Sequence, residues 1–424
     1  MTAISSGPPL PASALAAPGT KARPMVVTTM ALAQLGLFLA LLTPVFSSLA
    51  IKVQSLVGPD RAVGALATVS SLGAVAAFVA NPIFGRISDR TTGRFGRRRP
   101  WLLIGSLGLT VCLLVIATAN SVALIVVAWF AAQAFANAAL AAYTATLPDQ
   151  IPMAQRGTVS GLIGVMINVS ILGAAYAAEF LGEDMLGLFM IPGLVGFALV
   201  ALFAIVLPDK PLPQRPPSEG FKTVLKTFWV SPRKHPDFAF AWVSRFLVVL
   251  ASFMFTTFRL LFLQSRYDLP VKEATAVMAT GVLIYTVVLI VGAQVCGWLS
   301  DRLGRRKIFV FVSTLTFGIG AVLVMTAGSI GAFYVAEAVL GLGYGVYIAV
   351  DLALVADVLP NPDDSAKDLG VFNIANAGPQ ALAPAFGALL VSFGGGGNYD
   401  ALLIGAAAIC VVGAFAILGV KSVR

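Results

Sequence analysis

Charged residues are scarce in this sequence. Only 11% of the 424 residues are charged, while 58% are hydrophobic. A soluble domain carries about 25% charged residues, because its surface must be wetted. The chain cannot cover a water-facing surface of its size, so we expect its outer surface to face a lipid bilayer. The net charge of +9 does not indicate nucleic-acid binding, because the basic residues lie in short gaps between long apolar runs.

Cysteine and histidine are also nearly absent. The single histidine, His235, lies in an expected loop, and Cys112, Cys296 and Cys410 lie far apart within apolar runs. Such cysteines are typical of small buried hydrophobic residues, so we expect no disulfide, metal site or cofactor. The sequence shows no nucleotide-binding loop and no catalytic nucleophile arrangement. Primary pumping and enzymatic catalysis are therefore not expected.

Long apolar runs dominate the sequence instead. Crossing a bilayer takes roughly 20 apolar residues, and twelve runs qualify. They lie at about 25–50, 62–86, 101–119, 121–147, 156–182, 185–207, 237–265, 271–300, 306–326, 329–359, 367–393 and 399–420. The first is too long for a signal-peptide core. Residues 1–24 are expected to form a disordered tail, and the proline-rich stretch 208–236 is interpreted as the linker between bundles at 25–207 and 237–424.

The basic residues are unevenly distributed over the predicted loops. An even number of spans puts both termini on one side. The loops of the other side hold only Lys52, Arg61, Arg266 and Lys272 of the 28 Lys and Arg residues. Two more lie within spans, and the rest lie on the side of the termini. This asymmetry predicts that both termini and the linker are cytoplasmic in a plasma or inner membrane.

Two charged stretches occur once in each half. The first follows the second span: Gly85-Arg-Ile-Ser-Asp89-Arg90 leading to Gly96-Arg97-Arg98-Arg99, and Gly297-Trp-Leu-Ser-Asp301-Arg302 leading to Gly304-Arg305-Arg306-Lys307. The other follows the fourth span: Tyr143 to Asp149 and Pro152 leading to Arg156, and Asp351 to Asp357 and Pro360 leading to Lys367. Two matches in register indicate a duplicated six-span unit.

The first stretch resembles the Gly-x-x-x-Asp-Arg-x-Gly-Arg-Arg signature of the Major Facilitator Superfamily. The resemblance covers essentially the whole chain. It implies an all-α integral membrane protein whose twelve transmembrane helices form two pseudo-symmetric six-helix bundles. In this Major Facilitator fold the bundles surround a central cavity, lined by spans 1, 4, 7 and 10, that opens alternately to each side.

The first copy is four residues longer than the second. Its run from Ser88 to Pro100 resembles the loop of sugar–cation symporters, namely the glycoside–pentoside–hexuronide symporters and the plant sucrose–proton symporters. The glycoside symporters carry acidic residues inside spans 2 and 4. Residues 62–84 and 121–146 contain none here, so the resemblance does not extend to a sodium site.

The loop acids and bases have a predicted role in gating. A carboxylate at a helix end can accept bonds from a neighbouring arginine and from helix N-terminal amides. We predict a cytoplasmic charge network that holds the inner gate shut, made of Asp89, Arg90, Arg97, Asp149, Arg156, Asp301, Arg302, Arg305 and Asp357. The alternative is that these residues only set topology, which explains the outer arginines better than the acids.

Four charges lie inside spans, where they are rare and usually functional. Arg245 and Arg259 lie in span 7, and Glu337 and Asp351 in span 10. Each pair is spaced by nearly four helical turns, or about 21 Å, and the two spans run in opposite directions. We therefore predict that Arg245 pairs with Asp351 and Arg259 with Glu337. Asp351 and Glu337, with Arg245, either take up a coupling proton or are permanent struts.

Several uncharged polar residues are candidate solute ligands. Sugars are held by aromatic planes and by hydrogen bonds from polar groups. The predicted substrate-binding residues are Gln34, Trp129, Gln133, Asn137, Arg259, Tyr344 and Asn376. Amides inside membrane helices can also simply bond helices together. As a set these residues favour a polar, mostly uncharged cavity.

The sequence thus predicts a secondary active transporter that works by alternating access, as a monomer. Its predicted activity is proton-coupled symport of a sugar or glycoside. One alternative is an exporter of drugs or other amphiphiles, which would have an apolar cavity. Another is a membrane sensor that binds a solute without moving it.

Overall fold

The protein is described by a computed structural model that covers residues 22–182, 184–209, 211, 231–358, 365–394 and 397–421. The side chains of some further residues within the helices, among them Asp301 and Asp357, lie outside this description. So do most of the predicted tail and linker.

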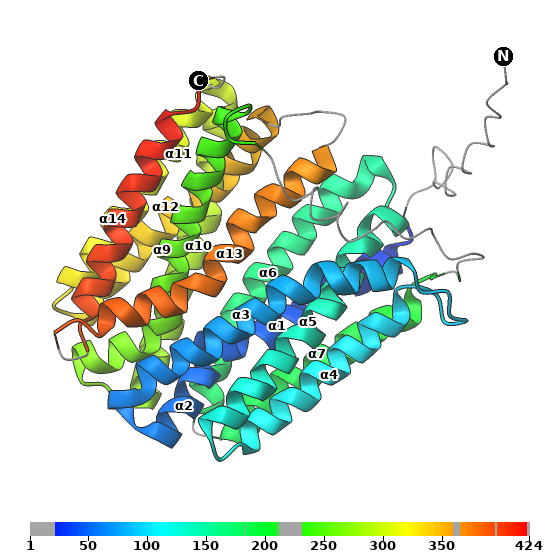
Figure 1. Cartoon of the computed structure of the whole chain (residues 1–424), viewed down its shortest axis with the longest axis horizontal. Helices are drawn as coiled ribbons and strands as arrows, with labels where there is room; N and C mark the ends of the chain where they lie inside the picture. The colour runs from blue at the N-terminus through cyan, green and yellow to red at the C-terminus, as the bar shows by residue number, and fades with distance from the viewer. Residues whose placement is uncertain are drawn as a thin grey trace.

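All regular structure in the described residues is helical (Figure 1). The N-terminal half holds α1 Pro24–Thr43, η1 Pro44–Ser48, α2 Leu49–Val57, α3 Pro59–Asp89, α4 Arg99–Thr118, α5 Val122–Gln150, α6 Met153–Leu181 and α7 Met185–Val206. The C-terminal half holds α9 Pro236–Tyr267, α10 Val271–Leu303, α11 Arg306–Thr326, α12 Ile330–Val358, α13 Ser365–Val391 and α14 Tyr399–Leu418.

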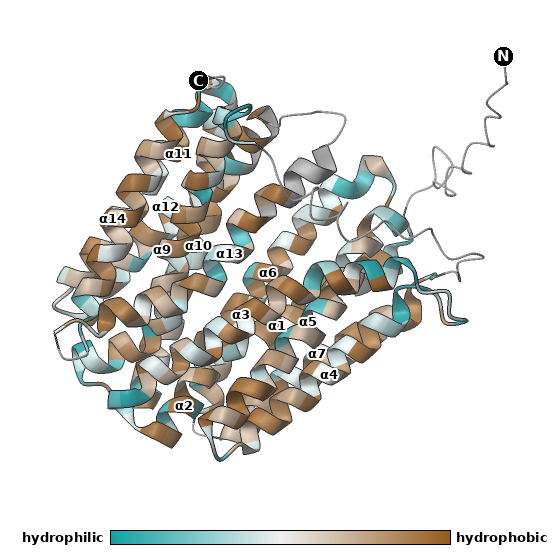
Figure 2. Cartoon of the chain, viewed as in Figure 1, coloured by the Kyte–Doolittle hydropathy of each residue, from teal (hydrophilic) through white to brown (hydrophobic). Residues whose placement is uncertain are grey.

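Twelve candidate membrane spans are found in the described part of the chain, which confirms the predicted number. Each is long and apolar enough to cross a bilayer. Apolar residues fill the middle of the helices, and hydrophilic residues gather toward their ends (Figure 2). The first span differs from its prediction, because it runs from Pro24 to Val57 through α1, η1 and α2. Pro44 has no backbone N–H to donate, and the chain passes it in a wide π-helical turn.

The duplication predicted from the loops extends to the helix boundaries. The register that aligns Asp89 with Asp301 also aligns the first residues of α1 and α9 and those of α3 and α10. The register that aligns Asp149 with Asp357 aligns both ends of α5 and α12. The two pseudo-symmetric six-helix bundles are therefore confirmed at the level of individual helices.

Both ends of the described chain lie at one face, which we call the termini face. Ala22 donates its backbone N–H to Gln155 at the start of α6 (2.8 Å), and Lys421 donates to Asp237 at the start of α9 (3.0 Å). The loop 90–98 lies at the same face. The other face, which we call the opposite face, holds the connections from α2 to α3, from α9 to α10 and from α13 to α14 (Figure 1).

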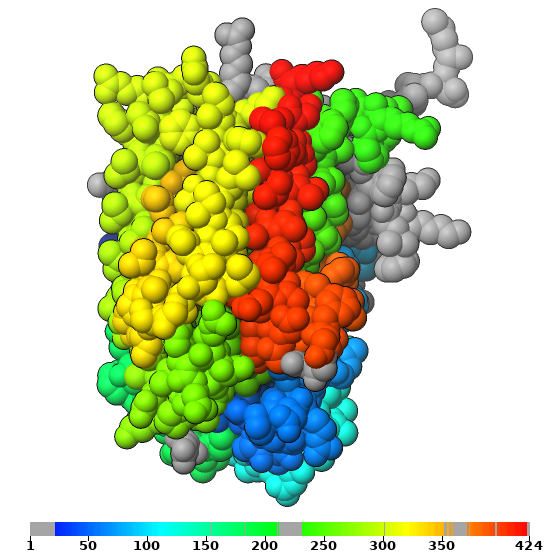
Figure 3. Space-filling model, turned by 90° about the vertical axis from the view of Figure 1, so that its left-hand side faces the viewer, coloured from blue at the N-terminus to red at the C-terminus, as the bar shows by residue number. Residues whose placement is uncertain are grey.

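The two halves meet chiefly along two pairs of helices, α3 with α13 and α6 with α10, and α9 also contacts η1 and α2. In α10, residues 274–286 are mostly buried, whereas the described residues of 287–303 are exposed or half-buried apart from Gly292 and Ser300. In α6 the buried residues also concentrate toward the opposite face, from Ser170 to Ala178. Figure 3 shows α2 and the start of α3, in blue, beneath the end of α13 and the start of α14, in orange-red, at that face. The halves therefore seal against each other near the opposite face and leave α6 and α10 largely uncovered near the termini face.

Candidate functional site

Two ion pairs join α9 to α12 inside the C-terminal half. Arg245 donates through Nη1 to Asp351 Oδ2, and Arg259 Nε lies 3.3 Å from Glu337 Oε1. Both predicted pairings are confirmed. The Glu337 and Asp351 side chains are 0% and 1% exposed, whereas Arg245 remains 15% exposed. The inner pair, Arg245–Asp351, is therefore the more accessible, and the outer pair, Arg259–Glu337, is enclosed.

Glycines on α12 bring the neighbouring helices close enough to enclose these charges. A Cβ atom on Gly341 or Gly345 would lie 2.3 or 2.2 Å from a backbone oxygen of α10, and one on Gly343 would lie 2.6 Å from the backbone nitrogen of Phe317 in α11. Alternate glycines thus place α12 between α10 and α11.

Aromatic rings surround both ion pairs. The guanidinium carbon of Arg245 lies 4.8 Å from the centroid of the Phe372 ring, and that of Arg259 lies 5.0 Å from Phe255. Arg259 also lies 5.7 Å from the Tyr285 ring of α10. Cation–π contacts of this kind contribute more where the cation is desolvated. The arginines are thus fixed by rings as well as by their carboxylates.

The N-terminal half holds a separate polar group at Gln34, Gln133 and Asn137. All three are buried. Asn137 accepts from Asn81 of α3 (3.2 Å) and donates to the Gln133 carbonyl oxygen (2.9 Å). Gln34 Oε1 has no partner among the described residues. Asn137 therefore bonds helices in this conformation, while Gln34 retains a free acceptor, and the predicted solute role of the group stays a prediction.

The position of Trp129 on α5 carries a different type of residue in the C-terminal half. The Trp129 ring is 1% exposed and packs on α3, where a Cβ atom on Gly73 would lie 2.3 Å from Nε1. In the two repeat registers Trp129 corresponds to Glu337, and Gly73 corresponds to Tyr285. The N-terminal half thus has an indole on a glycine where the C-terminal half has a carboxylate near a tyrosine. The remaining predicted ligands, Tyr344 on α12 and Asn376 on α13, are partly buried.

At the termini face the loop 90–98 carries a charge cluster. Arg98 is 5% exposed and bonds Asp89 at 2.6 Å, Asp149 at 3.1 Å and the Ser88 hydroxyl at 3.0 Å. Arg97 bonds Asp149 at 2.6 Å. The cluster therefore joins the loop to the ends of α3 and α5, and each of these contacts lies within the N-terminal half.

The N-terminal amides of α4 bond an acid that lies outside the predicted gate network. Asp209, just after α7, accepts from the backbone N–H groups of Arg98 (2.6 Å) and Arg99 (2.9 Å). Gly96 has φ +90°, and a Cβ there would lie 2.3 Å from Asp209 Oδ2. The carboxylate reaches these amides because α7 packs beside α4. Sequence reasoning missed Asp209 because it lies in the predicted linker.

The other predicted gate residues are spread along the termini face. Arg156 donates to the carbonyl oxygens of Pro148 and Ile151 at the end of α5, both at 3.0 Å. Arg90 follows α3, and Arg302 stacks over Trp298 at 5.3 Å. Arg305 is the exposed N-cap residue of α11. The side chains of Asp301 and Asp357 lie outside the described residues, so the second copy of the network stays a prediction.

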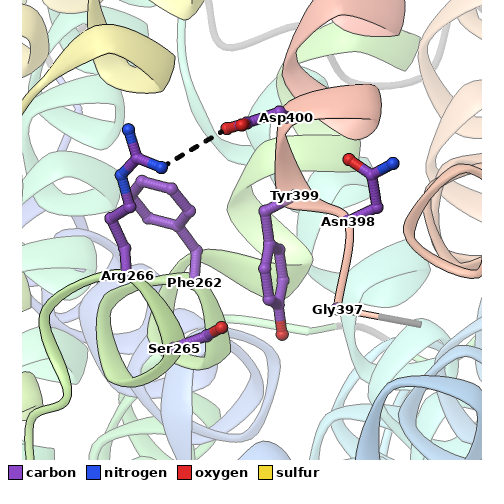
Figure 4. Close-up of a pocket in the computed structure, with 7 residues that line it drawn as sticks. All are labelled: Phe262, Ser265, Arg266, Gly397, Asn398, Tyr399 and Asp400. Atoms are coloured by element: carbon purple, nitrogen blue, oxygen red, sulfur yellow. Dashed lines mark ion pairs between the residues drawn. The ribbon is translucent and has the colours of Figure 1, made fainter. Parts of the chain in front are cut away.

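A small polar pocket lies at the opposite face between the ends of α9 and α14 (Figure 4). It encloses about 210 Å³ and is lined by Phe262, Ser265, Arg266, Gly397, Asn398, Tyr399 and Asp400. Arg266 Nη1 lies 3.8 Å from Asp400 Oδ1, and its Nη2 donates to the Met325 carbonyl oxygen at 2.7 Å. The arginine thus ties three helices together at this face.

The twelve apolar helices, the two-bundle repeat and the enclosed ion pairs define a multi-pass membrane protein of the transporter class. The sequence profile of the Major Facilitator Superfamily matches residues 24–292 and 279–423. The chain belongs to the Major Facilitator Superfamily, a family of membrane transporters.

The similar proteins include transporters of several kinds. The MFS transporter asaE of Aspergillus flavus is 26% identical over 250 residues, which are 58% of this chain and 52% of that protein. The drug efflux pump JefA of Mycobacterium tuberculosis is 35% identical over 96 residues, 23% of this chain and 19% of the pump. The chain thus spans between a fifth and about half of these relatives.

A crystal structure of the nucleoside transporter NupG superposes with a TM-score of 0.73 and 15% identity, covering 95% of this chain and 100% of that one. At this identity the likeness shows the fold.

Proposed function

We propose that this protein is a secondary active transporter that couples a proton to the symport of a neutral polar solute, a sugar or glycoside, by alternating access. The observation that carries the proposal is the pair of ion pairs between α9 and α12. Buried charges within spans are costly and usually mark ion pathways. Here Asp351 and Glu337 each face an arginine. The guanidinium can stabilise the negative charge of the carboxylate after its proton is released.

Alternating access agrees with the way the halves meet. They seal near the opposite face, while α6 and α10 are uncovered near the termini face. The uneven distribution of Lys and Arg favours termini in the cytoplasm of the plasma or inner membrane. In that orientation, we propose that this conformation is the state open to the cytoplasm. We propose that the charge cluster at Asp89, Arg98 and Asp149 belongs to the inner gate, and that the transporter acts as a monomer.

A neutral solute fits the polar groups of the N-terminal half. Gln34, Gln133 and Asn137 offer amides without charge, and Gln34 keeps a free acceptor. Together with Trp129, Arg259, Tyr344 and Asn376 they are the proposed ligands. The Ser88–Pro100 loop resembles that of the sugar–cation symporters and supports a sugar.

Flux measurements in proteoliposomes test the proposal. The full chain is reconstituted and offered radiolabelled sucrose, lactose, glucose and a phenyl glycoside, with and without an imposed proton gradient. We expect at least one of these to accumulate only when the gradient is present. Accumulation that follows a sodium gradient instead would reject proton coupling.

Export of amphiphiles is the second candidate, because a segment of the chain resembles a drug efflux pump. It predicts proton-driven movement of a lipophilic cation such as ethidium in the same vesicles and no sugar accumulation. Saturable binding of a solute without flux would instead indicate a sensor.

A further inference from the structure

The two ion pairs are connected by tyrosines. Tyr347 lies one turn from Asp351 on α12, and its ring stacks on that of Tyr344 with 6.1 Å between centroids. Tyr344 lies about two turns before Asp351 on the same face of α12. It lies one turn after Gly341, which packs against the Tyr285 peptide of α10. Tyr285 in turn lies beside Arg259. We call Tyr285, Tyr344 and Tyr347 the tyrosine column.

Several polar atoms along this route have no hydrogen-bond partner among the described residues. Glu337 Oε2 is buried and has no partner, and Glu337 Oε1 has only its 3.3 Å ion-pair contact with Arg259. The Tyr347 hydroxyl and Asp351 Oδ1 are also buried without a well-aligned bond, although these two side chains lie close enough to interact. A buried polar group without a partner costs about 1–3 kcal/mol. Native proteins retain such groups where water or a proton completes the bonding. A tyrosine hydroxyl both donates and accepts, so it can pass a proton on.

Accessibility changes along the route. Glu337 is 0% exposed and packs in the core near the opposite face. Asp351 is nearly as buried, but its partner Arg245 is 15% exposed. Tyr285 and Tyr344 are partly exposed between the two pairs. In this conformation the polar route from Glu337 therefore leads along the tyrosine column to the inner pair.

The other titratable residues of α10 and α11 lie toward the ends of these helices. α11 packs against α12 and carries no titratable residue beyond Arg306 and Lys307 at its start. α10 carries Lys272 and Glu273 at its first turn, and Cys296, Asp301 and Arg302 near its end. From α13, Phe372 covers Arg245. Among the described residues, the charged groups that contact the two carboxyls are Arg245 and Arg259.

We propose that the tyrosine column carries protons between Glu337 and Asp351, an inference that rests on the proposed proton coupling. The carboxyl of Glu337 gives its proton to the Tyr285 hydroxyl oxygen as that hydroxyl releases its own toward Tyr344. Tyr344 and Tyr347 repeat the exchange, directly or through one water, and Asp351 receives the last proton. Glu337 ends as a carboxylate facing Arg259, Asp351 ends neutral, and each tyrosine is unchanged.

The proton of Glu337 can be followed without a solute. Infrared spectra of the full chain in lipid bilayers show the carbonyl stretch of a protonated carboxyl, and the band lost in E337Q identifies this group. Transfer into D₂O shifts the band at the rate at which the proton exchanges. We expect Y344F and Y285F each to slow the shift on the order of 100-fold, the contribution of a positioned proton-transfer group. Tyr176→Phe, in α6 of the other half, is the matched control.

Phenylalanine keeps the ring, so these variants retain the packing of α12, and Y347F serves as a further variant. Exchange at the wild-type rate in both Y344F and Y285F would overturn the inference. So would the absence of an E337Q-sensitive band at every pH at which the protein stays folded. Because the readout involves no solute, the two proposals fail separately. Wild-type flux without proton coupling rejects the proposed function, whereas coupled flux with unslowed exchange in Y344F rejects the column alone.

Discussion

Gly341 of α12 lies on the peptide group of Tyr285 in α10, so that a Cβ atom at position 341 would be 2.3 Å from the Tyr285 carbonyl oxygen. The contact sets how closely α10 approaches the outer ion pair. We predict that Gly341→Ala forces the two helices apart and lowers the free energy of unfolding by about 1–3 kcal/mol, the usual cost of overpacking. Thermal unfolding in detergent micelles measures the change.

Gly161→Ala in α6 is the control, because a Cβ there meets no described atom within 4 Å. Alanine is the better helix former, so this variant should unfold at the same temperature as the wild type or slightly higher. Equal unfolding temperatures for Gly341→Ala and the wild type would mean that α10 and α12 are not in close contact.

Asp351→Asn separates proton coupling from a structural role of the inner pair. We expect the variant to exchange labelled solute across the membrane at equilibrium but to lose accumulation driven by a proton gradient, because an amide cannot take up the proton. The measurements are counterflow and gradient-driven uptake of the solute found in the proteoliposome panel.

Stability gives the alternative outcome for the inner pair. Removing one partner of a buried ion pair costs about 3–5 kcal/mol. If the pair has only a structural role, Asp351→Asn should unfold at a lower temperature than the wild type. It should then lose solute exchange and gradient-driven accumulation together. The double variant Arg245→Gln/Asp351→Asn leaves no unpaired charge, so it should then recover both.

The ion pairs were predictable because the rarity of charge within spans leaves few partners. Opposite helix directions matched Arg245 to Asp351 and Arg259 to Glu337 by depth alone. Tyr285 was not singled out, because its importance depends on how closely α10 crosses α12. Asn81 was missed for a similar reason, since its bond to Asn137 requires the packing of α3 on α5. The periodicity of a sequence shows which face of a helix a residue lies on and how deep it lies in the membrane. It does not show which helices pack together, and that packing determines the contacts of Tyr285 and Asn81.

Asp149 should hold the loop 90–98 in place, because it pairs with both Arg97 and Arg98. We predict that Asp149→Asn releases these arginines and speeds tryptic cleavage of the loop several-fold, without affecting the C-terminal half. Gel analysis of timed digests measures the rate. Asp60→Asn, at the exposed first turn of α3, should digest as the wild type does.

The same variant tests the gating proposal. If the cluster belongs to the inner gate, Asp149→Asn should also change the rate of solute exchange, whereas a residue that only sets topology should leave it unchanged. Faster digestion with unaltered exchange would therefore restrict Asp149 to anchoring the loop.

Lys52 shows why the sequence misplaced the end of the first span. It was assigned to the loop after a first span that ended near residue 50, but the helix continues through η1 and α2 to Val57. The Lys52 side chain is 8% exposed, and its Nζ donates to the Ala117 carbonyl oxygen at 2.8 Å. This carbonyl lies at the last turn of α4, where a cation is favoured.

We therefore expect Lys52→Met to lower the free energy of unfolding by about 1–3 kcal/mol, the cost of a buried acceptor left without a partner. Methionine has nearly the same length, so the packing of α2 is retained and the change reports the lost bond. Lys272→Met, at the exposed first turn of α10, is the control and should unfold as the wild type does. If both variants have the same free energy of unfolding, the end of α4 does not depend on Lys52. The continuation of the helix beyond Pro44 must then be stabilised by the apolar face of α2 alone.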